Sequence, residues 1–263
     1  MTPFVERLGR FTISYYSSHV EPRALLGAIS RAELVGGKGR GGIKIFEAGG
    51  LRLVSRKYMH GGLLRAFTRD LFLRPARATK EAEIMAYVRE KGLPAAAPFC
   101  AIEERLFPVC RIYLVTYLQE GAVELLDHLR QSTRRERLRC SRRLAELMWL
   151  MKESGVFHPD FHLKNVLVTP GKRLVFLDFD RSRRRTVSDR DMKSMFRRLA
   201  RFADKMVLQG RLDGSDEEKA LFVRTYARLS GTDPDGWMRG GGRRTYLNRL
   251  GWLVESLLYG RRS

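Results

Sequence analysis

The stretch that decides how this chain is interpreted is HPDFHLKNVLV, residues 158–168. It contains His158, Asp160 and Asn165, and a second aspartate, Asp178, follows thirteen residues after Asn165. Because several hydrogen-bonding and acidic groups fall within a short distance along the chain, their spacing indicates a shared chemical task.

The elements around this stretch place it on a loop. Before it, apolar residues recur at helical spacing from Leu144 to Met151, and Gly155 ends that pattern. After it, two apolar runs flank the turn Pro170-Gly171 and predict a hairpin. Loops held between rigid elements are frequent places for catalytic residues.

The spacing H-x-D-x-x-x-x-N is that of the catalytic loop of protein kinases. In that interpretation Asp160 is catalytic and faces the acceptor hydroxyl, while Asn165 and Asp178 hold Mg²⁺, which prefers oxygen ligands. Each residue alone has an ordinary structural explanation as a cap or turn residue. Their joint occurrence between a helix and a hairpin favours ATP-dependent phosphoryl transfer.

A glycine-rich segment upstream fits a phosphate-binding role. Gly37, Gly39, Gly41 and Gly42 form G-x-G-x-x-G, and glycines let backbone N–H groups approach phosphates. The segment leads into predicted strands and not into a helix, which favours a kinase-type loop over a dinucleotide-binding turn. A flexible loop remains the alternative.

A cation for the ATP phosphates is expected on the strand that ends in Arg56 and Lys57. Arg56 shares strand parity with Val54, so Leu53-Val54-Ser55-Arg56 overlays the kinase V-A-I-K pattern and favours Arg56 over Lys57. The acidic partner on the following helix is expected to be Glu81, with Glu83 as the alternative.

The order of elements predicts an α+β fold with two lobes. Residues 1–30 are expected to be an irregular lead-in, 31–118 a small lobe with an antiparallel sheet and one helix, and 119–263 a larger, mainly helical lobe. Apolar residues from Met192 to Met206 predict one long amphipathic helix, and those from Tyr246 to Leu257 predict another.

Composition limits the possible partners. Lys and Arg number 50 against 29 Asp and Glu, a net charge of +21, so anionic surfaces or substrates are expected. Cys100, Cys110 and Cys140 lack metal-site spacing, and no apolar stretch has the roughly 18 residues of a membrane span. The chain is therefore expected to be cytoplasmic, with no specific nucleic acid and no obligatory protein partner.

The sequence resembles the bacterial lipopolysaccharide core kinases, which include 3-deoxy-D-manno-octulosonic acid (Kdo) kinase and heptose kinases. The resemblance runs from about Gly37 to Arg201. It rests on the following motifs: Gly39-Arg40-Gly41, Arg56-Lys57-Tyr58 with Gly61-Gly62-Leu63, Glu81 before Gly92-Leu93-Pro94, Leu177-Asp178-Phe179-Asp180-Arg181, and the arginine-rich helix with Arg197, Arg198 and Arg201. His162 and Lys164 depart from the catalytic loop of that family.

The resemblance implies a protein-kinase-like fold and ATP-dependent phosphorylation of a sugar hydroxyl, most simply on Kdo of a lipid A precursor at the cytoplasmic face of the inner membrane. Four arginines after Asp178, namely Arg181, Arg183, Arg184 and Arg185, are candidates for binding an anionic glycolipid. The chain runs from Asp180 into a long helix with no A-P-E segment, which argues against a peptide substrate. The alternatives are a heptose or other small-molecule kinase, an atypical protein kinase, and a basic pseudokinase scaffold at membranes.

Overall fold

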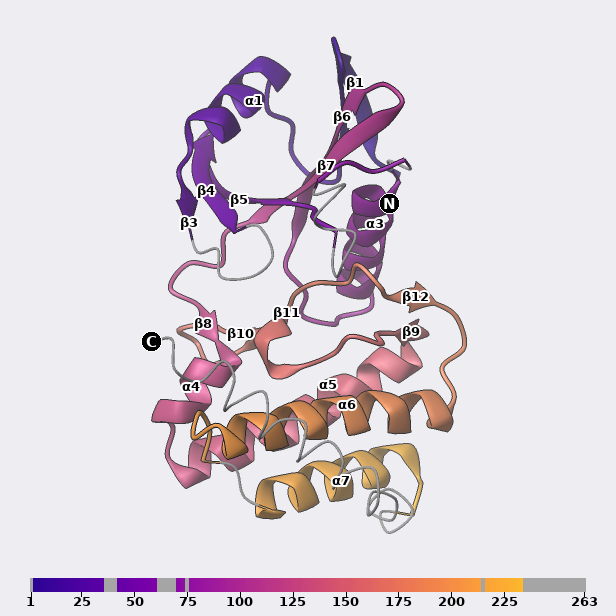
Figure 1. The fold of residues 1–263 in the computed structure, drawn as a ribbon. Coiled ribbons are helices and arrows are strands. Elements are labelled where there is room, and N and C mark those ends of the chain that lie inside the picture. The colour runs from indigo at the N-terminus through magenta and orange to yellow at the C-terminus, as the bar shows by residue number, and fades with distance from the viewer. Residues whose placement is uncertain (1, 36–41, 61–69, 74–75, 214–215, 234–263) are drawn as a thin grey trace. The chain divides into compact units, whose positions relative to one another are not determined.

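The computed structural model describes residues 2–35, 42–60, 70–73, 76–213 and 216–233 of the 263-residue chain. The chain divides into two compact units. The sheet unit comprises Met1–Gly121 and Phe176–Ser182, and the helical unit comprises Ala122–Val175 and Arg183–Ser263. This α+β organisation confirms the predicted fold class (Figure 1).

The sheet unit is built on one antiparallel sheet with the strand order β1-β2-β6-β7-β5-β4-β3. Its strands are β1 (Phe4–Leu8), β2 (Phe11–Tyr15), β3 (Leu34–Val35), β4 (Ile43–Ala48), β5 (Leu51–Lys57), β6 (Pro98–Leu106) and β7 (Val109–Tyr117). The hairpin β4–β5 and its Gly49-Gly50 turn are as predicted, and both glycines have positive φ angles.

The two described helices of the sheet unit lie on opposite faces of the sheet. Leu53 packs in one cluster with Leu25 of α1 (Pro22–Arg31). Arg56, three residues further along β5 and therefore on the other face, contacts Glu81 of α3 (Arg77–Glu90). The functional face of β5 is thus the one that carries α3.

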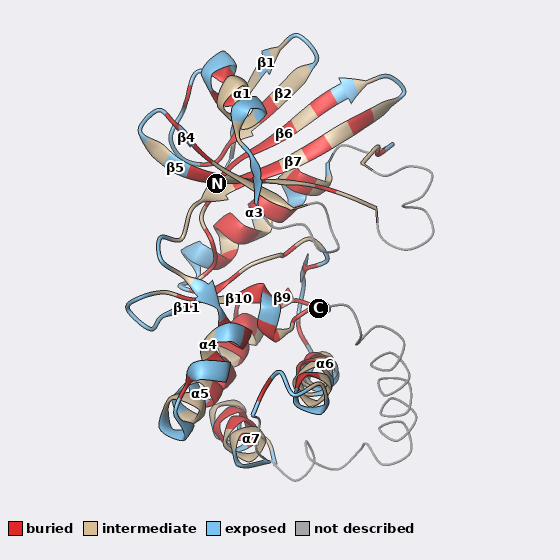
Figure 2. Ribbon diagram, turned by 60° about the vertical axis from the view of Figure 1, so that its left-hand side comes forward, coloured by how far each residue is buried: buried red, intermediate tan, exposed pale blue. Residues whose placement is uncertain are grey.

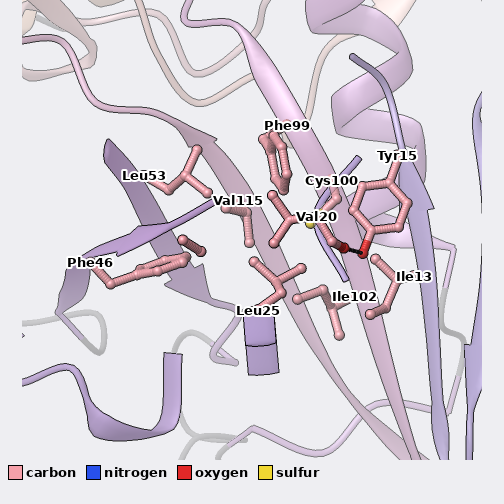
Figure 3. Packing of buried hydrophobic residues seen from close by; sticks show 11 residues of the cluster. Ile13, Tyr15, Val20, Leu25, Phe46, Leu53, Phe99, Cys100, Ile102 and Val115 are labelled. Carbon is pink, nitrogen blue, oxygen red and sulfur yellow. Dashed lines mark hydrogen bonds between the residues drawn. The ribbon is translucent and has the colours of Figure 1, made fainter. Parts of the chain in front are cut away.

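The apolar core on the α1 side holds the sheet together (Figure 3). Tyr15, Phe99 and Cys100 are all buried there, and the Tyr15 and Phe99 rings meet edge to face at 5.7 Å. The Tyr15 hydroxyl donates a hydrogen bond to the Val20 carbonyl at 2.6 Å, which satisfies the polar end of that buried ring. Cys100 is a core residue and a free thiol.

The first thirty residues are regular and not the irregular lead-in that we expected. β1 and β2 form a hairpin that joins β6, and α1 follows. The alternation of Phe11, Ile13 and Tyr15 with polar residues is a strand signal in the sequence itself. Pro22 at the first helical turn and the Glu21 carboxylate, which accepts from the Ala24 N–H at 2.7 Å, start the helix.

The helical unit contains long helices with short strands between them. Its elements are β8 (Val123–Glu124), α4 (Leu125–Gln131), α5 (Arg134–Glu153), β9 (Val156–Phe157), the 3₁₀ turn η2 (Leu163–Asn165), β10 (Val166–Val168), β11 (Leu174–Phe176), β12 (Arg183–Arg184), α6 (Asp189–Leu208) and α7 (Asp216–Ser230). The predicted hairpin is β10–β11 in the sheet β11-β10-β8.

The predicted amphipathic helices of this unit are confirmed up to residue 208. Both α5 and α6 begin with reciprocal caps, Thr133 with Glu136 and Ser188 with Asp191. Their apolar sides are buried and their charged sides face solvent (Figure 2). The helix predicted from Tyr246 lies outside the described residues, and none of the described helices combines the length and apolarity that a bilayer crossing requires.

Candidate active site

Arg56 lies between two carboxylates of the sheet unit. Its Nη2 donates to both oxygens of Glu81, at 2.7 Å to Oε1 and 2.6 Å to Oε2. Its Nη1 lies 3.0 Å from Oδ1 of Asp178. One guanidinium therefore connects strand β5 with helix α3 and with the aspartate that the sequence assigns to metal binding.

The Glu81 carboxylate accepts further hydrogen bonds. The Tyr58 hydroxyl donates to Oε2, and the backbone N–H of Phe179 donates to Oε1 at 3.0 Å. Burial raises the pKa of Glu81 to about 7, even though the Arg56 guanidinium opposes that rise. Burial also disfavours the charge on Arg56, but Glu81 and Asp178 outweigh it and hold the pKa of Arg56 well above its ordinary value.

Lys57, the alternative cation, lies on the opposite face of the sheet. Its ammonium pairs with Asp70, and it lies 6.0 Å from the centre of the Tyr113 ring. Glu83, the alternative acidic partner, is exposed. The structure thus brings together Arg56, Glu81 and Asp178 and leaves both alternatives outside this cluster.

The segment after Asp178 is held against the beginning of α3. Asp178 itself has a left-handed backbone, with φ at +58°, and Phe179 is fully buried. Arg77 forms a two-pronged ion pair with Asp180 and lies over the rings of Tyr58 and Phe72. Asp180, which stands where protein kinases have the glycine of their D-F-G motif, therefore has a specific cationic partner.

Sequence reasoning missed Tyr58 and Arg77 as members of this cluster. A signal for Arg77 existed, because it lies four residues before Glu81 and so on the same face of the helix. Tyr58 shares strand parity with Arg56, although β5 ends at Lys57.

The second group of predicted residues lies in the helical unit. Asn165 is buried, and its amide nitrogen donates to the backbone carbonyl of Asp160 at 3.2 Å, which closes the loop around η2. The Asp160 carboxylate, only 16% exposed, pairs with Arg198 of α6. His158 is fully buried, with its ring 5.6 Å from that of Phe161.

The arginine on Asp160 was also missed. From the sequence we named Arg198 only as part of an arginine-rich helix and did not connect it with Asp160, which lies 38 residues away in sequence. The same helix holds the loop a second way, because the His162 and Phe202 rings stack at 4.9 Å with planes 16° apart. Helix α6 therefore orients both the proposed catalytic aspartate and the histidine two residues after it.

Comparison with known proteins assigns this arrangement to a family. The model of the lipopolysaccharide kinase (Kdo/WaaP) family matches residues 30–226, which include every site residue described above. This chain belongs to the lipopolysaccharide kinase family. It is accordingly an ATP-dependent kinase, and the resemblance seen in the sequence is confirmed.

Several curated members of the family are similar to most of the chain. Three of them, each named 3-deoxy-D-manno-octulosonic acid kinase, come from Xanthomonas oryzae pv. oryzae, Xylella fastidiosa and Stenotrophomonas maltophilia. Their identities are 28% over 214 residues, 25% over 214 and 27% over 219, respectively. Each alignment covers 80% of this chain and 82% of the relative. The match is thus to nearly the whole protein and not to an isolated motif.

In this lipopolysaccharide kinase the four arginines after Asp178 have different surroundings. Arg181 is exposed, and Arg183 and Arg184 form the exposed strand β12. Arg185 is engaged within the helical unit, because it pairs with Asp191 at 2.7 Å and lies 4.6 Å from the centre of the Phe157 ring. The geometry of Arg185 favours a structural role.

The glycine-rich segment is only partly described. Gly37, Gly39 and Gly41 lie outside the described residues. Gly42 has a left-handed backbone, with φ at +59°, at the start of β4. A residue with a side chain would be strained there, which agrees with a tight entry from a glycine-rich loop into the strand.

The oxygen groups present suit Mg²⁺. Within the described ranges, no group of three His, Cys, Asp or Glu side chains is placed to hold a metal. Mg²⁺ does not require one, since it binds through one or two carboxylates together with substrate phosphates. Asp178 offers a carboxylate that is 27% exposed, and Asn165 uses its amide nitrogen on the loop, so its amide oxygen remains a candidate ligand.

Proposed function

We propose that this lipopolysaccharide kinase transfers the γ-phosphoryl group of Mg-ATP to a hydroxyl of Kdo on a lipid A precursor. The observation that carries the proposal is the position of Arg56, fixed by Glu81 and directed at Asp178. A cation beside a metal-binding carboxylate is what a triphosphate with its metal needs.

In the proposed reaction the acceptor oxygen attacks the γ-phosphorus while the bond from that phosphorus to the β–γ bridging oxygen breaks and ADP leaves. Asp160 orients the acceptor hydroxyl and takes its proton. Arg56 donates to the phosphate oxygens, while Glu81 and Tyr58 keep it in place. When bound, Mg²⁺ supplies positive charge to the phosphates, with Asp178 and Asn165 as its proposed protein ligands.

The names of the relatives and the chemistry of the exposed arginines support the proposed acceptor. The curated relatives are named for Kdo, a sugar acid, and a lipid A precursor adds phosphate groups. Arg181, Arg183 and Arg184 are exposed and could bind such anions, since guanidinium groups match carboxylate and phosphate geometry. The kinase would then meet its acceptor by peripheral contact at the cytoplasmic face of the inner membrane.

Product analysis by mass spectrometry tests this function. The kinase is incubated with Mg-ATP and Kdo-bearing lipid A, and the expected product carries one added phosphate on the Kdo residue. Parallel reactions with heptose-bearing lipid, free sugars and a basic protein cover the alternative acceptors. Phosphate on heptose would contradict the Kdo assignment, and no transfer to any acceptor would favour the pseudokinase alternative.

A further inference from the structure

Helix α6 has a charged line directly opposite its buried side. With 3.6 residues per turn, each residue advances by about 100°, so Arg190, Arg197, Arg201 and Leu208 fall within about 20° of one line along the helix. All four are exposed. The buried residues of α6, namely Met192, Met195, Leu199 and Met206, lie on the other side.

Within the part of the chain that the structure describes, the arginines of this line have no ion-pair partner. The acidic residues of α6 are engaged elsewhere: Asp189 with Lys152 at 2.6 Å, Asp191 with Arg185 at 2.7 Å and Asp204 with Lys219 at 2.6 Å. Among the residues that the structure describes, none forms an ion pair with Arg190, Arg197 or Arg201. Their positive charge is therefore available to a partner.

Helix α5 shows the contrast. Its arginines Arg134, Arg142 and Arg143 are also exposed, but each lies in an ion pair with a glutamate, at 2.6, 3.3 and 2.9 Å respectively. Exposed ion pairs of this kind contribute little to stability. These three arginines of α5, which pair with Glu217 and Glu146, are thus a set of equal charge that differs from the α6 line in having ion-pair partners.

The end of α6 adds apolar groups to the charge. Val207 is 38% exposed and Leu208 is 48% exposed, although both are large apolar residues. A line of arginines that ends in exposed leucine has the two properties of an interfacial helix, cationic groups for lipid phosphates and apolar groups for the acyl boundary. Between Arg190 and Leu208 the line is about 27 Å long, which suits an extended partner surface.

We infer that the outer line of α6, defined by Arg190, Arg197, Arg201 and Leu208, is a docking surface for an anionic lipid bilayer. The same helix holds Asp160 through Arg198, about 100° around the helix from Arg197. Docking along this line would therefore fix the proposed catalytic aspartate relative to the membrane. This deepens the proposed function, because a lipid-linked acceptor lies in that membrane.

The inference is tested by flotation of the full-length kinase with vesicles of phosphatidylglycerol and phosphatidylcholine that contain neither acceptor nor ATP. The triple variant Arg190→Gln, Arg197→Gln, Arg201→Gln should bind roughly a hundredfold more weakly at low salt, since each basic group near an anionic surface contributes about a factor of five. Leu208→Asn should weaken binding several-fold, and that loss should persist at high salt because it is apolar.

The control variant Arg134→Gln, Arg142→Gln, Arg143→Gln removes the same total charge from α5. It should reduce binding far less than the α6 variant, and circular dichroism should show both variants folded. Equal losses in the two variants would overturn the inference, because net charge alone would then explain binding. It would also be overturned if the α6 variant bound like wild type, or if wild type preferred duplex DNA to the vesicles through the same three arginines. The flotation assay contains neither acceptor nor ATP, so its outcome does not depend on whether the protein transfers phosphate to Kdo.

Discussion

The surroundings of Glu81 and of Asp160 differ in how many of the described groups hold each carboxylate. In the sheet unit, Glu81 accepts from Arg56, Tyr58 and the Phe179 N–H, and Arg77 holds Asp180 as well. In the helical unit, one guanidinium from α6 pairs with the Asp160 carboxylate. The Glu81 carboxylate is almost fully buried and accepts from three donors, whereas the Asp160 carboxylate is partly exposed and, among the described residues, its side-chain partner is Arg198.

This difference agrees with separate roles for the two regions, nucleotide binding for the first and acceptor binding for the second. A triphosphate and its metal need charges in fixed positions, and mutually dependent hydrogen bonds hold them there. An acceptor-facing carboxylate must release its partner or share it with an incoming hydroxyl, which a single contact permits. We therefore expect changes in the Glu81 network to affect folding and nucleotide use together, and changes at Arg198 to affect turnover alone.

The largest expected effect is on Glu81. Glu81→Ala would leave Arg56 and Tyr58 without their buried partner, and it should lower the free energy of unfolding by about 3 kcal/mol. Glu83→Ala, on the exposed side of the same helix, is the matched control and should change little. Urea denaturation measures both, and a loss at Glu83 as large as that at Glu81 would contradict the network.

The next largest expected effect is on kcat/KM for ATP, and it distinguishes Arg56 from its neighbour Lys57. Arg56→Met should lower kcat/KM for ATP roughly tenfold to a hundredfold, because a charge-assisted hydrogen bond contributes about 1.5–3 kcal/mol. Lys57→Met removes the same charge from the opposite face and should have little effect. Steady-state kinetics with varied ATP decide between them, and the reverse order would assign the phosphate cation to Lys57.

A smaller effect is expected at Arg198. Arg198→Gln should lower kcat about tenfold while the Kd for ATP stays the same, because it changes the orientation of Asp160 and not the nucleotide site. Arg198→Lys should recover part of the loss, and Arg224→Gln on α7, which is exposed, is the control. If Arg198→Gln raised the Kd for ATP and left kcat unchanged, the assignment of nucleotide binding to the Glu81 network and of acceptor orientation to Asp160 would be wrong.

The smallest effect lies far from the site, at the cap of α5. A hydrogen bond from Lys172, helped by Thr133, lowers the pKa of Glu136 from 4.5 to about 2. The charged form therefore stabilises the folded state above about pH 4.5, and that contribution is lost as the pH falls towards 2. Glu136→Gln should unfold at slightly lower urea than wild type at pH 7, and the two should converge in acid. A constant difference at every pH would mean that the charge is not involved.

Much of the site could be predicted from local pattern. The motif spacing singled out Asp160, Asn165 and Asp178, and strand parity separated Arg56 from Lys57, because side chains alternate between the faces of a strand. The amphipathic helix α6 was equally clear, since its apolar residues recur with the helical period.

What could not be predicted is pairing between distant residues. Arg77 with Asp180 and Arg198 with Asp160 join positions 103 and 38 residues apart, and nothing in local spacing selects such partners. Helix α7 was also missed, although Asp216, Glu217 and Glu218 in its first turn are a helix-start signal. In the first thirty residues the apolar–polar alternation covers only a short strand, and we predicted an irregular segment there although this alternation indicates a strand.

We propose above all that the sheet unit binds Mg-ATP through Asp178 while Asp160 acts on the acceptor. Calorimetric titration of ATP, with and without Mg²⁺, into the Asp178→Ala and Asp160→Asn variants tests it directly. Asp178→Ala should lose the Mg²⁺-dependent part of the affinity, whereas Asp160→Asn should bind Mg-ATP like wild type although it no longer transfers phosphate. Unchanged Mg²⁺-dependent affinity in Asp178→Ala, or an equal loss in Asp160→Asn, would contradict the account.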